Sequence, residues 1–127
     1  MSDMFERGLE IRTEVLGPEY VGSSMTGATE FSRPIQDLAT EYSWGAIWSR
    51  PGLTKKTRSL ITIAMLSACE HPHALRIHIR GALRNGCTPD EIQEVFLQAA
   101  IYVGMPAAMD CVRLAQEVLD EQQPSRP

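Results

Sequence analysis

The sequence predicts an all-α fold. No stretch alternates apolar and polar residues with a period of two, so we expect no β-strands. Apolar residues instead recur at helical spacing in about six segments, several of which start at a capping residue or end at glycine or proline. We therefore expect a single helical domain over residues 1–127, with residues 1–3 and 122–127 frayed.

In the first part of the chain, a helix is expected over residues 4–16, ended by Gly17 and Pro18. The residues 17–33 are rich in glycine, serine and threonine, and we expect a long ordered loop with at most a short helical turn around residues 25–29. A helix then runs from Pro34 to about Trp48, before a turn at residues 49–52. Its apolar face carries Ile35, Leu38, Ala39 and Tyr42.

The second part of the chain has clear helix start and stop signals. Thr54 is a suitable N-cap, Pro72 suits a first helical turn, and Gly86 is a suitable C-terminal glycine. A capping box at residues 88–91 starts the next helix, Gly104 ends it, and Pro106 begins the last. The expected buried faces are Leu60, Ile61, Ala64, Met65 and Ala68; then Ile92, Val95, Phe96 and Ala99; and finally Val112, Ala115 and Leu119.

Composition narrows the function classes. The hydrophobic content of 43% and charged content of 22% are ordinary for a globular protein. The net charge of −4 argues against a nucleic-acid partner, and no apolar run approaches the roughly 18 residues of a membrane span. The acidic N-terminus does not resemble a signal peptide, so we expect a cytoplasmic protein. Three widely spaced cysteines form neither a disulfide framework nor a CxxC motif.

His78 is the first candidate for chemistry. Leu75, His78, Ile79 and Ala82 follow one helical face, which places an imidazole in an apolar seam. Imidazole titrates near neutrality, so it suits proton transfer. A histidine in such a seam is also compatible with a hydrogen-bonded core residue.

Three other groups each have a functional and a structural interpretation. The corner at residues 69–73 holds Cys, Glu and two His, and a solvated turn is favoured there over a metal site. Arg76, Arg80 and Arg84 form either a solvated face or an anion-binding row, and Arg50 and Arg58 are further anion-binding candidates. Trp44 and Trp48 wall an apolar pocket, form a subunit contact, or fill the core.

Several motifs resemble the carboxymuconolactone decarboxylase family, and the similarity extends from about residue 5 to residue 119. They are residues 44–45, 48–53, 57–60, 78–86, 88–92 and 100–108, which read WG, WSRPGL, TRSL, HIRGALRNG, TPDEI and AIYVGMPAA. The resemblance implies an alkylhydroperoxidase D-like helical subunit that assembles into a ring, as a trimer or hexamer, with sites near subunit contacts.

The resemblance also implies an activity. The type enzyme removes CO₂ from 4-carboxymuconolactone without a cofactor or metal, in the β-ketoadipate pathway of aromatic catabolism. His78 matches the family's histidine and would move the proton, and Arg58 matches its arginine and would hold a carboxylate or oxyanion. The residues expected to bind the carboxylated small-molecule substrate are Trp44, Trp48, Arg50, Tyr102, Val103 and Met109.

The sequence departs from the family pattern at several positions. Ala46 stands where a carboxylate is usual, Val103 where cysteine is usual, and Met109 where asparagine is usual. These differences leave two alternatives open: an enzyme recruited to isomerisation, cyclisation or elimination of a less polar metabolite, or a ring protein that binds a small molecule without converting it. His71 and Ala74 replace the CxxC of the peroxidase branch, which excludes thiol peroxidase chemistry.

Overall fold

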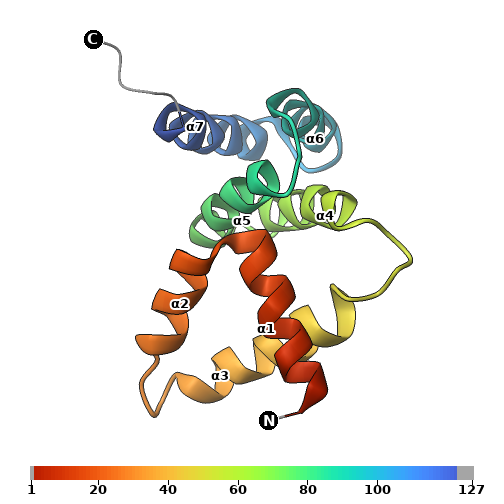
Figure 1. The fold of residues 1–127 in the computed structure, drawn as a ribbon. Helices are drawn as coiled ribbons and strands as arrows, with labels where there is room; N and C mark the ends of the chain where they lie inside the picture. The colour runs from red at the N-terminus through yellow and green to blue at the C-terminus, as the bar shows by residue number, and fades with distance from the viewer. Residues whose placement is uncertain (1, 123–127) are drawn as a thin grey trace. The chain divides into compact units, whose positions relative to one another are not determined.

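The computed structural model describes residues 2–122, and this range contains seven α-helices, one π-helix and no β-strand (Figure 1). The predicted all-α class is confirmed. The chain divides between Lys55 and Lys56 into two compact units. The single domain over residues 1–127 stays a prediction. The fraying expected for residues 1 and 123–127 lies outside the described residues, whereas Ser2 and Asp3 form the cap and the first residue of α1.

The first unit is built from α1 (Asp3–Leu16), α2 (Pro18–Thr26), α3 (Arg33–Leu38) and the π-helix η1 (Ala39–Ile47). The Ser2 hydroxyl accepts the Phe5 N–H at 3.1 Å, which caps α1, and Gly17 ends it with a φ of 95°. Helix α1 packs against both α2 and η1. The core of the unit consists of Ile11, Val15, Trp44 and Trp48.

The loop predicted over residues 17–33 is wrong, because α2 occupies its first half. Pro18 stands in the first turn of α2, where its fixed φ favours a helix, and Glu19 complements the helix dipole there. Val21 is the one buried residue of this helix. A helix that buries a single side chain among serines and glycine has too little apolar periodicity to be recognised from sequence.

The helix predicted from Pro34 to Trp48 is present, but most of it is π-helical. The α-helical part ends at Leu38 and η1 continues the chain without a break. In a π-helix each N–H bonds to the carbonyl five residues back, as the Trp48 N–H does to the Ser43 oxygen at 3.0 Å. The expected apolar face at Ile35, Leu38 and Tyr42 is exposed. Thr40, Trp44, Gly45 and Trp48 are the residues buried instead.

The second unit contains α4 (Lys55–Ala68), α5 (Pro72–Arg84), α6 (Pro89–Tyr102) and α7 (Met105–Glu121). The predicted capping box is confirmed: the Thr88 hydroxyl accepts the Glu91 N–H, and the Glu91 carboxylate accepts the Thr88 N–H. Gly86 ends α5 as predicted, with a φ of 96°. The Gly86 and Cys87 N–H groups bond to the Leu83 and Ala82 carbonyls, which is the Schellman arrangement.

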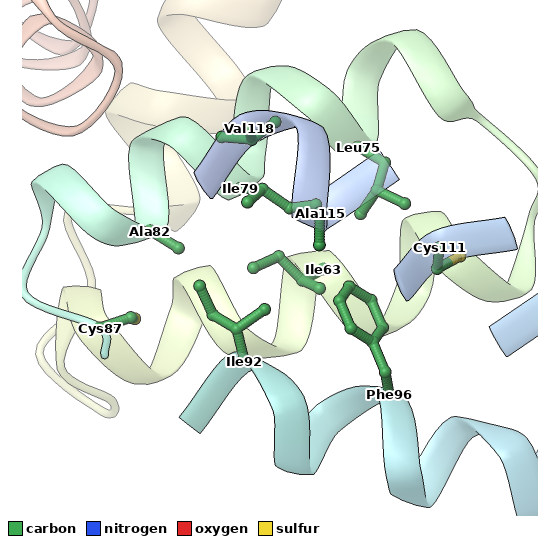
Figure 2. Close-up of a cluster of buried hydrophobic side chains, with 10 residues drawn as sticks. All are labelled: Ile63, Leu75, Ile79, Ala82, Cys87, Ile92, Phe96, Cys111, Ala115 and Val118. Carbon is green, nitrogen blue, oxygen red and sulfur yellow. The ribbon is translucent and has the colours of Figure 1, made fainter. Parts of the chain in front are cut away.

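All four helices of the second unit contribute to one apolar core (Figure 2). Helix α7 packs against both α5 and α6. Ile63 of α4 and Ile79 of α5 are fully buried at the centre. The remaining members are Leu75, Ala82, Cys87, Ile92, Phe96, Cys111, Ala115 and Val118. This core fixes which faces of α4 and α5 are turned outward.

The predicted buried face of α4 is wrong. The residues that it buries are Ser59, Ile63 and Ser67, while Met65 and Ala68 are exposed and Leu60, Ile61 and Ala64 are half-buried. The two serines are accommodated because their hydroxyls bond internally: Ser67 donates to the Ile63 carbonyl at 2.7 Å, and Ser59 accepts from the Asn85 amide at 3.2 Å. Val112 of α7 is likewise exposed, contrary to expectation.

Candidate functional site

His78 lies in the middle of α5, at the edge of its buried face. Leu75, Ile79 and Ala82 are buried as the sequence predicted, and His78 is half-buried beside them. At about 3.6 residues per turn, His78 falls on the flank opposite Arg76 and Arg80. Those two arginines contact α7, so His78 lies on the flank that is turned away from α7. A half-buried imidazole beside apolar side chains suits proton transfer to a small molecule.

Arg58 lies on α4, the helix that precedes α5 and shares its core. The Arg58 side chain is half-buried, and its carbonyl accepts the Thr62 hydroxyl at 2.8 Å. Leu60 and Ala64 turn the other flank of α4 toward α6, where they line a groove. Arg58 and His78 therefore belong to two helices of one unit, with Arg58 on the flank of α4 opposite its groove with α6 and His78 on the flank of α5 opposite its ion pairs with α7.

Trp44 and Trp48 lie in the first unit, where η1 places them one turn apart. Both are buried, and their rings stack with centroids 4.5 Å apart and planes inclined by 28°. Ala46, the position at which the family resemblance predicts a carboxylate, lies between them in the same π-helix and is half-buried. Arg50 is exposed just beyond, in a turn closed by its N–H and the Ile47 carbonyl. π-helical segments are frequent at functional sites.

Tyr102, Val103 and Met109 lie elsewhere on the second unit. Tyr102 and Val103 line the groove between α4 and α6, on the flank of α4 opposite Arg58. Met109 lines a separate groove between α6 and α7. Tyr102 is 83% exposed and Met109 58% exposed. The second unit therefore does not bring these three residues to the flanks that carry Arg58 and His78, and their role in substrate binding stays a prediction.

The row of arginines on α5 is largely paired with α7. Arg76 bonds to Glu117 and lies 3.6 Å from Glu121, and the Arg80 guanidinium is bidentate to Glu121 at 2.9–3.0 Å. These ion pairs tie α5 to α7. Arg84 is exposed at the end of the helix.

The corner between α4 and α5 is exposed at Cys69, Glu70, His71 and His73. Glu70 and His71 line a cavity of about 170 Å³, with Asp110 and Cys111 of α7 on its other wall. Within residues 2–122, no group of three His, Cys, Asp or Glu side chains is placed to hold a metal ion. No helix in that range is long and apolar enough to cross a membrane.

One buried charged residue, Arg12, is not among the site residues predicted from the sequence. Arg12 of α1 is only 5% exposed and bonds to Gln36 and Thr40. The sequence does carry a signal for it, because Arg12 interrupts an otherwise apolar helical face formed with Phe5, Leu9 and Leu16. A charged residue at such a position marks a buried polar network.

Comparison with known proteins identifies relatives over most of the chain. The model of the carboxymuconolactone decarboxylase family matches residues 33–117. The chain is 41% identical to 4-carboxymuconolactone decarboxylase of Acinetobacter baylyi over 117 residues, which are 92% of this chain and 87% of that protein. It is also 41% identical to the nitrosuccinic acid decarboxylase npaB of Metarhizium robertsii over 118 residues, 93% of this chain and 82% of that protein.

A third relative has no assigned function. An uncharacterized 15.0 kDa protein of Paracoccus denitrificans is 36% identical over 85 residues, 65% of this chain and 63% of that protein. The family match and the two long alignments agree with the family resemblance of the motifs and with the helical fold. The chain belongs to the carboxymuconolactone decarboxylase family.

Proposed function

We propose that this protein is a cofactor-free carboxy-lyase that decarboxylates 4-carboxymuconolactone or a closely related carboxylated lactone. The observation that carries the proposal is the 41% identity over nearly the whole chain to a 4-carboxymuconolactone decarboxylase. The half-buried His78, beside the buried Leu75, Ile79 and Ala82, supports it. Its place in aromatic catabolism and its cytoplasmic location remain predictions.

The reaction needs an electron sink, a cation and a proton donor. When the bond to the leaving carboxylate breaks, CO₂ departs and the electron pair moves through the conjugated double bond into the lactone carbonyl, giving an enolate. Arg58 is assigned to the developing oxyanion or to a substrate carboxylate, because a guanidinium binds either through charge-assisted hydrogen bonds. His78 is assigned to deliver one proton to the carbon next to the carbonyl. No electrons are gained or lost overall, so no redox partner is required.

A nitro-substituted dicarboxylate is the second candidate substrate. The identity to the nitrosuccinic acid decarboxylase is also 41%, so sequence similarity does not rank the two substrates. A nitro group on the carbon that loses CO₂ accepts the electron pair directly, whereas the lactone carbonyl accepts it through the conjugated double bond. Both candidates also keep a second carboxylate after CO₂ leaves. The chemistry common to both is therefore loss of CO₂ from a small dicarboxylate beside an electron sink.

The role of His78 can be tested against a histidine on the same helix. We expect His78→Gln to lower kcat by about 10²–10⁴-fold, the usual contribution of a general acid–base residue. His73→Gln is the control, because His73 is exposed at the start of α5 and should leave kcat unchanged. The measurement is CO₂ release from 4-carboxymuconolactone. Equal rates for the two variants would remove His78 from the mechanism.

We further propose that the protein assembles into a homotrimeric or homohexameric ring. Support comes from the exposed apolar side chains of the second unit, which include Leu97, Ile101, Met105 and Val112. Leu97, Met105 and Val112 line one groove, and exposed apolar surface of this kind commonly marks a protein–protein contact. The positions of Tyr102, Val103 and Met109, away from the flank of Arg58 in their own unit, favour a site to which a neighbouring copy contributes these residues.

A further inference from the structure

Arg12 is a buried cation that bonds to neutral groups. Its guanidinium donates to the Thr40 hydroxyl at 3.1 Å and to the Gln36 side-chain oxygen at 2.9 Å, and it lies 3.7 Å from the Met25 sulfur. Within the described part of the first unit, no carboxylate lies within ion-pair distance of it. Burial lowers the pKa of Arg12, and the nearby Tyr20 hydroxyl partly opposes that change. Burying a charge without a counter-charge is costly, so this network calls for a reason beyond packing.

The network joins α1 to the point at which α3 becomes η1. Gln36 is in α3, and Thr40 is the second residue of the π-helix. The fully buried Thr40 hydroxyl accepts from Arg12 and donates to the Gln36 carbonyl at 2.8 Å. Arg12 thus spans one helical turn through two of its nitrogens. A planar guanidinium donates to these two acceptors from two different nitrogens held in a fixed plane, whereas a lysine ammonium has all its donors on one nitrogen.

Beyond that point, η1 carries Trp44, and the Trp48 that stacks on it is the C-cap of the π-helix. Helices α1 and η1 approach at backbone contact: a Cβ on Gly8 would lie 1.9 Å from the Thr40 carbonyl oxygen, and one on Gly45 would lie 2.2 Å from the Met4 carbonyl oxygen. The π-helix is rare and needs its surroundings to hold it in place. If η1 returned to α-helical register, the residues that follow would rotate by about 100° around the helix axis for each residue shifted. Trp44 and Trp48 would then leave their buried positions.

We propose that Arg12 is a positioning residue: it holds the start of η1 in place and so keeps Trp44 and Trp48 stacked. The proposal rests on the proposed function and on the sequence-based expectation that these two tryptophans bind the substrate. Arg12 is not assigned any contact with the substrate. It acts through Thr40, Gln36 and the π-helix.

The experiment compares Arg12→Gln and Arg12→Lys with Arg7→Gln, a control at an exposed arginine of the same helix. Trp44 and Trp48 are the two tryptophans of the chain, so tryptophan emission and the exciton band of stacked indoles in circular dichroism report on this pair alone. We expect both Arg12 variants to lose the exciton band and to shift the emission to longer wavelength. We also expect KM to rise on the order of tenfold while kcat changes little, since about one hydrogen bond of positioning is lost. Arg7→Gln should match the wild type.

A second pair of variants tests the same network in case the Arg12 variants do not fold. Gln36→Ala removes one of the two acceptors at a half-buried position, and Thr40→Val removes the shared hydroxyl with little change of volume. Each should weaken the exciton band in a folded protein. Folded Arg12 or Thr40 variants that keep the wild-type spectra and KM, and differ only in melting temperature, would overturn the proposal. The spectra need no substrate, so they decide the stacking even if the wild type converts neither candidate compound.

Discussion

At the scale of single residues, the ends of α4 and α5 use the same backbone turn with different side chains. At the end of α4, the His71 N–H bonds to the Leu66 carbonyl at 3.2 Å, and Glu70 has a φ of 56°. At the end of α5, Gly86 occupies the equivalent left-handed position. A side chain in this region is strained, whereas glycine is not. Glu70 therefore occupies a position that glycine would fill with less strain.

We predict that Glu70→Gly raises the free energy of unfolding by about 0.5–1 kcal/mol, because relief of the left-handed strain exceeds the added entropy of the unfolded chain. Gly86→Ala is the matched control and should lower it by about 1 kcal/mol. Urea unfolding followed by circular dichroism measures both. A less stable Glu70→Gly protein would show that the glutamate side chain makes contacts at this corner that outweigh the strain.

At the scale of helices, the contact of α1 with η1 depends on Gly8. A Cβ there would overlap the Thr40 carbonyl oxygen, and neither backbone can move without breaking helical hydrogen bonds. We predict that Gly8→Ala destabilises the protein by about 1–3 kcal/mol, the usual effect of overpacking. Gly22→Ala is the control, because a Cβ added at this position of α2 would meet nothing within 4 Å. That substitution should stabilise the protein by about 0.5–1 kcal/mol. Equal stabilities would contradict the close approach of the two helices.

The start of α6 should give a pH-dependent contribution to stability. The pKa of Glu91 is lowered, first by the hydrogen bond from the Thr88 N–H and then by the Lys56 ammonium 3.0 Å away. The carboxylate form is therefore favoured by folding, so its contribution is present at neutral pH and is lost as the pH falls through the lowered pKa.

We predict that Glu91→Gln is less stable than the wild type at pH about 7, and that the difference shrinks below pH about 4.3 as the wild-type carboxyl group takes up a proton. Urea unfolding at a series of pH values gives the difference. Glu94→Gln on the same helix reports the general effect of removing a carboxylate from α6. A difference that stays constant with pH would contradict the role of the charged Glu91 at this cap.

Elements with strong local signals were predictable from the sequence, and those shaped by tertiary contact were not. The capping box at Thr88 and the glycine end at Gly86 follow from local chemistry, and both were predicted correctly. Helix α2 was missed because it buries only Val21. The π-helix was missed because its register depends on α1, through Gly8 and Arg12, and no local pattern records that contact.

In the candidate site, too, some features were predictable from the sequence and others were not. The buried face beside His78 was predicted correctly from the spacing of apolar residues, since Leu75, Ile79 and Ala82 are all buried. The buried face of α4 could not, because Ser59 and Ser67 are polar residues whose hydroxyls find partners only once the helices pack. The importance of Arg12 likewise becomes visible only when its partners in α3 and η1 are placed.

At the scale of the whole molecule, the proposed ring can be tested through the outer face of α6. Ile101 is 78% exposed, so a charge there should cost little in a monomer and much in an apolar subunit contact. We predict that Ile101→Glu reduces the assembly to smaller species, measured by size-exclusion chromatography with light scattering. Glu94→Lys, a charge reversal at an exposed polar position of the same helix, should keep the mass of the wild type. A wild type that runs as a monomer would contradict the ring.

The central claim is that this chain removes CO₂ from a small carboxylated substrate without a cofactor. The most direct measurement mixes wild-type protein with 4-carboxymuconolactone, and separately with nitrosuccinic acid, in the absence of added cofactor, and follows CO₂ release. We predict turnover of the lactone, with loss of that turnover in His78→Gln. Turnover of nitrosuccinic acid alone would move the assignment to the second candidate substrate. Folded protein that releases no CO₂ from either compound would contradict the proposed function.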